Sequence, residues 1–126
     1  MEKYFVTYNQ ALSLKELGFD EPCFGIYFPS DKSWKDIKFK NSQQDNIVAS
    51  PLKSQLFDWI RTKYKYYFWI EPCSQHKIFH FNITCSPSSF TYCTIDETKP
   101  NAGGFKSYEE AESACIDKLI EIVKNR

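Results

Sequence analysis

Hydrophobic and polar positions recur along this chain of 126 residues with two periods, one typical of helices and one typical of strands. Three segments have the helical period, and each follows a residue suited to cap a helix. We expect helices after Thr7, Ser50 and Ser107, with Gly18 just past the first and Pro51 opening the second. The third helix has an apolar face wider than one stripe, formed by Tyr108, Ala111, Cys115, Ile116, Leu119, Ile120, Ile122 and Val123.

Four other segments have the composition of strands, and two of them, Cys23–Phe28 and Lys77–Cys85, also alternate between two faces. They are Cys23–Phe28, Tyr66–Ile70, Lys77–Cys85 and Phe90–Ile95, and Glu71-Pro72 is expected to end the second of them. Residues 32–49 are mostly polar, and no element is assigned to them. Three apolar side chains in this segment could attach a loop or an edge strand to the body of the protein: Trp34, Ile37 and Phe39. The pattern predicts one α+β domain over residues 1–126, in the order α-β-α-β-β-β-α, with three helices and a mostly antiparallel sheet of about four strands.

Charge and hydropathy argue against binding to duplex DNA or to a membrane and against secretion. Lys and Arg total 16 and Asp and Glu total 16, so the formal net charge is zero. A binder of duplex DNA or of an anionic membrane would need a basic excess. No apolar run reaches the roughly 18 residues of a membrane span, and Glu2-Lys3 is not followed by the apolar stretch of a secretion signal. We therefore expect a cytoplasmic protein that binds neither a membrane nor duplex DNA.

Motifs that carry catalysis are scarce. The cysteines, 23, 73, 85, 93 and 115, form no CxxC pair and are expected to be reduced thiols packed as small apolar residues. Cys73, His76, His80 and Cys85 have a spacing that suggests zinc ligands, but a strand would point the last two to opposite faces. A nucleophile pair of Cys73 with His76 lacks a visible orienting group. We expect no enzyme, no cofactor and no metal, with a small zinc or thiol enzyme as an alternative.

Aromatic and basic residues gather in the middle of the chain. Phe, Tyr and Trp make up 17% of the residues, more than a core of this size needs. Residues 32–65 hold eight Lys and Arg against three Asp, a net charge of +5. Cations beside stacking rings can hold a planar anion such as a nucleotide. The candidate ligand-binding residues are Arg61, Lys63 and Lys65 for phosphate, and Tyr64, Tyr66, Tyr67 and Trp69 for stacking. The alternative is a solvated helix end followed by a core strand.

The three helical blocks resemble a group of small bacteriophage and prophage proteins. The resemblance covers Thr7–Cys23, Ser50–Tyr64 and Ser107–Val123, and it is weaker over the strands between them. It implies a protein of the infected cell's cytoplasm, and small phage proteins often act by binding, including sequestration of nucleotide signals of host immunity. The group has no established activity, so no site residue is carried over.

These patterns lead to a binding hypothesis. We expect a non-enzymatic phage-type accessory protein that sequesters an anionic, nucleotide-like small molecule and counteracts host immune signalling. The wide apolar face of the last helix suggests a homo-oligomer formed through that helix. The alternative is a protein–protein interaction module that inhibits or adapts a host protein through the same helix and the surplus aromatic residues.

Overall fold

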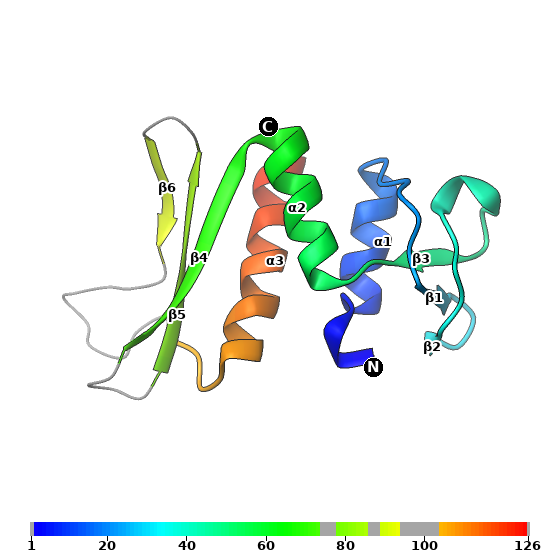
Figure 1. The fold of residues 1–126 in the computed structure, drawn as a ribbon, viewed down its shortest axis with the longest axis horizontal. Coiled ribbons are helices and arrows are strands. Elements are labelled where there is room, and N and C mark those ends of the chain that lie inside the picture. Colours follow the sequence, from blue (N-terminus) through cyan, green and yellow to red (C-terminus); the bar gives the residue numbers. More distant parts are fainter. Residues whose placement is uncertain (1, 74–77, 86–88, 94–103, 126) are drawn as a thin grey trace. The chain divides into compact units, whose positions relative to one another are not determined.

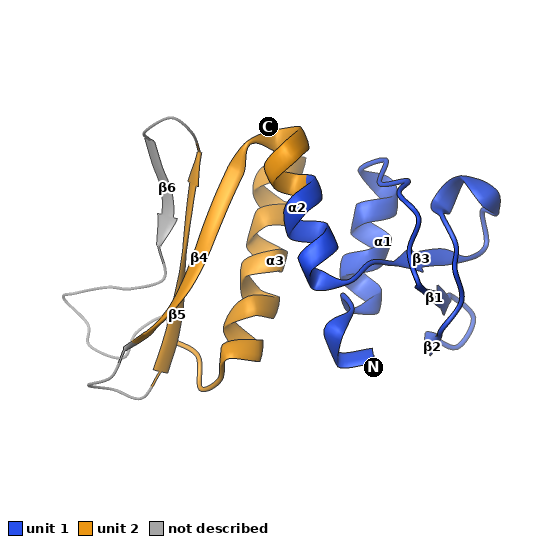
Figure 2. Ribbon diagram, in the orientation of Figure 1, with its two compact units in different colours: residues 1–59 blue, residues 60–126 orange. Residues whose placement is uncertain are grey.

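The computed structural model describes residues 2–73, 78–85, 89–93 and 104–125 (Figure 1). The chain divides into two compact units, residues 1–59 and 60–126 (Figure 2). The expected α+β class with three α-helices is confirmed. The strands form two three-stranded antiparallel sheets, one in each unit, where the sequence predicted one sheet of about four strands. The prediction of a single domain stays a prediction.

The first sheet has β1, Gly25–Phe28, between β2, Ser33–Lys35, and β3, Val48–Ser50. Tyr27 pairs with Trp34 on one side and with Val48 on the other. Both outer strands lie in residues 32–49, to which the sequence assigned no element, except that β3 also includes Ser50. Each has three residues, too few to show an alternating pattern, so pairing with β1 defines them and local sequence does not.

Helix α1 spans Tyr8–Glu16 and has the ends that the sequence predicted. The Thr7 hydroxyl accepts a hydrogen bond from the Gln10 backbone N–H, and the Gln10 side chain accepts one from the Thr7 N–H. Gly18 has the left-handed φ of 89°, and the Phe19 N–H returns to the Leu14 carbonyl. These bonds satisfy backbone groups that a helix end leaves open.

The predicted start of the second helix is wrong. Helix α2 spans Lys53–Tyr64, and Ser50 is the last residue of β3 rather than a helix cap. Leu52 forms an isolated bridge with Phe5, and its carbonyl accepts the Leu56 N–H at 3.0 Å. Ser50 and Leu52, which a local capping rule assigned to the helix, instead pair with other strand segments. Helix α2 contributes residues to both units.

The core of the first unit lies between α1 and the sheet, since α1 packs against β3. Its innermost side chains are Val6, Leu14, Phe19, Ile26, Val48 and Leu56. The buried Asn41 side chain ties two backbone segments together. Its Nδ2 donates to the Phe19 carbonyl at 2.8 Å, and its Oδ1 accepts from the Ala49 N–H at 2.9 Å. A buried amide with both ends bonded fixes this irregular segment to the sheet.

The second sheet is the predicted meander, in the order β4-β5-β6. Its strands are Tyr66–Cys73, Ile78–Cys85 and Ser89–Cys93. Strand β4 continues through Glu71 and Pro72, which the sequence took as its end, and Pro72 pairs with Phe79. An edge strand tolerates proline because one side of its backbone has no partner strand. The extension places Glu71 inside the sheet, opposite His80.

Helix α3 spans Tyr108–Lys124 and packs against β4 and β5. The Ser107 hydroxyl caps it by accepting the Glu110 N–H at 3.1 Å, as predicted. Of the eight residues of its apolar face, Tyr108 is exposed and Ile122 is partly buried, whereas the other six are buried within the chain: Ala111, Cys115, Ile116, Leu119, Ile120 and Val123. The width of that face therefore gives no reason to invoke a second subunit. None of the helices in the described ranges is both long and apolar enough to span a membrane.

Candidate functional site

The structure spreads the seven sequence-predicted ligand-binding residues over three settings. Arg61, Lys63 and Tyr64 lie in the last turn of α2, where the Lys63 ammonium is 5.4 Å from the centroid of the Tyr64 ring. Lys65 links α2 to β4 and has the left-handed φ of 63°. The other three are on β4: Tyr66, Tyr67 and Trp69.

Strand β4 divides its aromatic side chains between two faces, because alternate residues of a strand point to opposite sides. Phe68 pairs with Ile83, which is fully buried, so the face of Phe68 is the one that packs on α3. Tyr66 is on that same side. Tyr67 and Trp69 are on the other side, with 38% and 46% of their surface exposed. The structure thus brings Tyr67 and Trp69 together and separates Tyr66 from them.

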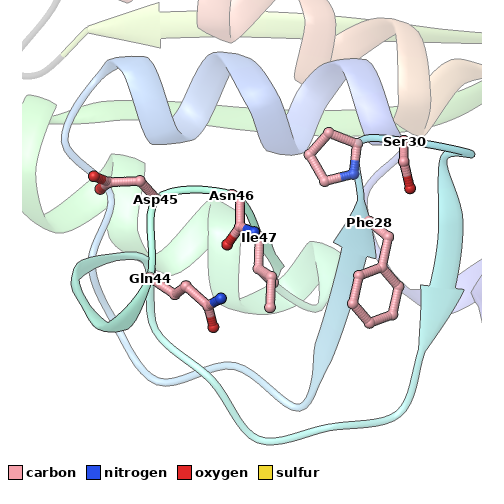
Figure 3. A pocket seen from close by; sticks show the side chains of 7 residues that line it. Phe28, Ser30, Gln44, Asp45, Asn46 and Ile47 are labelled. Atoms are coloured by element: carbon pink, nitrogen blue, oxygen red, sulfur yellow. The ribbon is translucent and has the colours of Figure 1, made fainter.

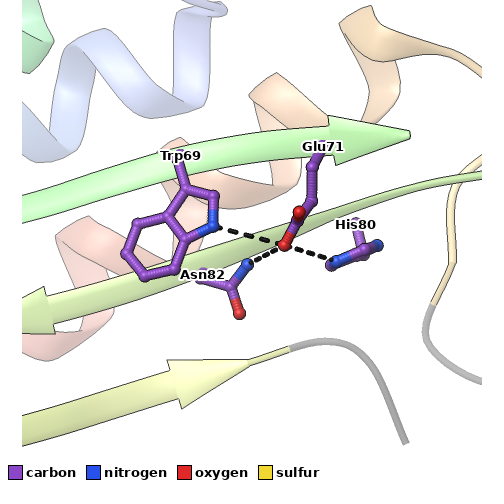
Figure 4. A network of polar contacts seen from close by, with 4 residues as sticks. All are labelled: Trp69, Glu71, His80 and Asn82. Atoms are coloured by element: carbon purple, nitrogen blue, oxygen red, sulfur yellow. Dashed lines mark hydrogen bonds and ion pairs between the residues drawn. The ribbon is translucent and has the colours of Figure 1, made fainter. Parts of the chain in front are cut away.

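The Glu71 carboxylate lies beside the Trp69 ring. Figure 4 shows Trp69, Glu71, His80 and Asn82 converging on one face of β4 and β5. Oε1 of Glu71 accepts hydrogen bonds from His80 Nε2 at 3.0 Å, Asn82 Nδ2 at 3.0 Å and Trp69 Nε1 at 3.3 Å. The strand register explains the convergence, since Glu71 pairs with His80 and Trp69 with Asn82. We call Tyr67, Trp69, Glu71, His80 and Asn82 the open face.

Electrostatics hold this carboxylate in its charged form. The hydrogen bond from His80, followed by those from Trp69 and Asn82, lowers the pKa of Glu71 below its usual value, while slight burial opposes the shift. An ionised carboxylate only accepts, so His80 Nε2 carries a proton. His80 Nδ1 is enclosed and has no hydrogen-bond partner in the described part of the chain. The hydrogen bond to His80 therefore orients the Glu71 carboxylate, and the second ring nitrogen of His80 is closed to solvent.

The exposed atoms of Glu71 and of the two rings determine which ligands the open face can bind. The side chain of Glu71 is 49% exposed, and the three hydrogen bonds that it accepts from described residues end on Oε1, so that within the described ranges Oε2 has no donor. The residues of β4 on this face are two rings and a carboxylate, Tyr67, Trp69 and Glu71, and Lys65 immediately precedes the strand with a left-handed φ. The extended chain from Tyr66 to Glu71 spans about 17 Å. This face can stack a planar group and accept an N–H at one end.

Sequence reasoning missed Glu71 and Asn82 as site residues. Ending the strand at Glu71-Pro72 removed Glu71 from the alternating set that begins with Tyr67 and Trp69. The missed signal is that the same alternation continues across Pro72 and matches a polar pair on β5, His80 and Asn82. A proline in an edge strand is compatible with this continuation.

The zinc and thiol alternatives receive no further support. The described residues contain no group of three or more His, Cys, Asp and Glu side chains able to hold a metal ion. His80 is bonded to Glu71, and Cys85 lies five residues later on β5, which places it on the opposite face. The Cys73 side chain and His76 lie outside the part of the chain that the structure describes.

A pocket of about 560 Å³ lies in the first unit (Figure 3), and none of the seven predicted residues lines it. Its lining is Phe28, Pro29, Ser30, Gln44, Asp45, Asn46 and Ile47. The Lys15 ammonium donates to the carbonyls of Asp45 and Ile47 and so holds the loop that forms one wall. The lining has no cation and no exposed aromatic platform, so this pocket does not suit a nucleotide.

The chain matches no protein-family model, and no curated protein or solved structure is significantly similar to it. Function is therefore argued from the geometry of the open face. The resemblance to phage proteins stays an expectation about context.

Proposed function

We propose that this protein binds a nucleotide-like small molecule on the open face of its second sheet. The observation that carries the proposal is that the exposed side chains of Tyr67 and Trp69 lie on the same face of β4. Exposed rings two residues apart on a strand are about 6.7 Å apart along the chain, which suits the stacking of flat groups. Every nucleobase has a flat π-face that an aromatic side chain can stack on.

The charges along β4 match the polarity of a nucleotide. Lys65 stands at one end of the row and is exposed, whereas the Glu71 carboxylate stands at the other. A phosphate near Lys65 and a base near Trp69 would each meet the complementary chemistry. The extended chain from Tyr66 to Glu71 spans about 17 Å, which exceeds the screening length of roughly 8 Å at physiological salt, so Glu71 repels a phosphate near Lys65 weakly.

A cationic ligand is the competing interpretation, because a ring beside a carboxylate can also hold an ammonium group. Two features favour the nucleotide. Oε1 of Glu71 is already occupied by three N–H donors, which reduces its pull on a cation. Lys65 at the start of β4 adds a positive charge that a cationic ligand would have to avoid.

The biological role follows from the expected context. A cytoplasmic phage-type protein that holds a nucleotide without converting it would lower the free concentration of that nucleotide. Sequestration of this kind removes a signal from host immune receptors, and it needs no catalytic group.

Calorimetric titration with linear and cyclic nucleotides tests the proposal. We expect saturable binding in the micromolar range by wild type, and at least about fivefold weaker binding by Trp69→Leu and by Tyr67→Leu, because base–aromatic stacking contributes roughly 1–3 kcal/mol. The matched control is Phe24→Leu, which removes an aromatic ring of similar exposure, 57%, from the first unit. We expect this control to bind as wild type does.

Two outcomes would overturn the proposal. One is the absence of binding for every nucleotide at high micromolar concentration, with the protein folded by near-ultraviolet circular dichroism. The other is saturable binding of tetramethylammonium chloride that Trp69→Leu abolishes while nucleotides stay inert. That second result would assign the open face to a cation.

A further inference from the structure

We infer that Glu71 selects a guanine base by accepting its N–H groups at the edge of the stacking platform. This inference rests on the proposed function and names the ligand class of the same face. It concerns the one charged side chain that the open face carries among the described residues.

The Glu71 carboxylate has a fixed orientation. Donors from three different residues, on two strands, meet at Oε1 with separations of 3.0, 3.0 and 3.3 Å. Two of these donors, on His80 and Asn82, are themselves buried. A carboxylate held in this way loses little rotational freedom when it accepts a further bond. Oε2 has no hydrogen bond within the described chain and is the acceptor left for a ligand.

The orientation of the Trp69 ring determines where a stacked base would lie. The indole N–H of Trp69 points at the Glu71 carboxylate, so the edge of the ring that carries Nε1 faces this group (Figure 4). A flat base stacked on the indole would have one of its own edges in the same direction. That edge would meet Oε2, which accepts hydrogen bonds and donates none.

The bases differ in the hydrogen-bond donors and acceptors on their edges. Guanine has two adjacent N–H donors, the ring N1–H and the 2-amino group, with no acceptor between them. The amino groups of adenine and cytosine each stand beside a ring nitrogen that accepts, and the imide N–H of uracil is flanked by two carbonyls. A carboxylate repels those acceptors and is satisfied best by guanine. Hydrogen bonds to a charged acceptor are the stronger kind, so the preference is measurable.

The experiment compares GMP, IMP and AMP on the full chain by calorimetric titration. We expect wild type to bind GMP at least about tenfold more tightly than AMP, with IMP between them because it lacks the 2-amino group. Glu71→Gln should bring the GMP-to-AMP affinity ratio close to one, because it removes the charged acceptor that favours guanine and repels the acceptor of adenine, while both bases still stack on Trp69. The matched control is Glu109→Gln, which neutralises an exposed carboxylate at the start of α3 and should keep the preference.

The possible results separate this inference from the proposed function. Equal binding of the three nucleotides, or a Glu71→Gln variant that keeps the guanine preference, overturns the role of Glu71 and leaves nucleotide binding standing. Failure of all three to bind overturns both. If Glu71→Gln does not fold, as judged by circular dichroism, Asn82→Ser serves instead. This substitution keeps the carboxylate and removes one of the bonds that orient it, so the guanine preference should fall; an unchanged preference would count against the inference.

Discussion

His80 on β5 faces Glu71 on β4 across the strand pair, with its Nε2 3.0 Å from the carboxylate Oε1. The imidazole is almost fully buried, whereas the carboxylate is half-exposed. One partner is therefore anchored in the sheet and the other reaches solvent. This relationship makes Glu71 both the acceptor that satisfies buried donors and a group that a ligand can touch.

Removing the carboxylate should destabilise the protein. Glu71→Ala leaves the buried His80 Nε2 and Asn82 Nδ2 without their acceptor, so we expect the free energy of unfolding in urea to fall by about 1–3 kcal/mol. The comparison is Glu121→Ala, which removes one partner of an exposed pair with Lys118 at 3.3 Å and should cost below about 0.5 kcal/mol. Equal losses for the two variants would show that the network on the open face adds no stability.

The same carboxylate should make stability depend on pH. Hydrogen bonding, chiefly from His80, lowers the pKa of Glu71 in the folded state below its usual value near 4.5. Its contribution is thus complete above the unfolded pKa and is lost as the pH falls through the folded pKa. We expect the difference in unfolding free energy between wild type and Glu71→Gln to be constant from pH 7 to about pH 6 and to shrink below about pH 4.5. A difference that does not change between pH 6 and pH 3 would contradict this.

A glycine contact should limit substitution in the first sheet. A Cβ at Gly25 would lie 2.6 Å from Trp34 Nε1, and the Trp34 ring packs against Phe5 with centroids 4.9 Å apart. Gly25→Ala should therefore lower the unfolding free energy by about 1–3 kcal/mol through overpacking. The loss should shrink when it is combined with Trp34→Leu, since the two sites are coupled. Gly18→Ala is the control, because its cost comes from a φ of 89° and Trp34→Leu should not relieve it.

Two thiols should resist modification in the folded protein. Burial, with a smaller effect of Glu21, raises the pKa of Cys23 to about 12, and burial likewise raises the pKa of Cys115. Because the thiolate is the reactive form, iodoacetamide at pH 8 should leave both residues unmodified in native buffer and label them in urea. Peptide mass mapping measures this. Labelling of Cys115 in native buffer at the rate of a free thiol would show that α3 is less closely packed than the structure indicates.

Local signals in the sequence predicted the parts of the fold that local interactions determine. The ends of α1 and α3 follow from Thr7, Gly18 and Ser107, whose bonds reach only a few residues along the chain. Strands β2 and β3 were not predictable in this way, since three residues carry no period and their partners lie elsewhere in the sequence. The pairing of β3 also explains why Ser50 was misassigned as a helix cap.

The candidate site was predictable only in part, for the same reason. The sequence predicted Tyr67 and Trp69 as ligand-binding residues, and the structure leaves both exposed on one face of β4. It also grouped Tyr66 with them, although strand geometry sends Tyr66 to the other side. Glu71 joins the site through pairing with His80, which depends on the register of β4 against β5. Register is a property of two segments together, and composition does not reveal it.

Lys65 offers a variant in which stability and binding should change in opposite directions. Its φ of 63° is the left-handed conformation that favours glycine, and its N–H bonds to the Arg61 carbonyl at 3.2 Å to close α2. We expect Lys65→Gly to raise the free energy of unfolding by up to about 1 kcal/mol. The same variant should weaken nucleotide binding and make it less sensitive to salt, because one cation near the phosphate is lost. Lys32→Gly is the matched control, since Lys32 is the other left-handed lysine, with a φ of 59°, and belongs to the first unit. It should gain stability in the same way and bind nucleotide as wild type does. If Lys65→Gly also binds like wild type at low salt, the phosphate does not lie at the Lys65 end of β4.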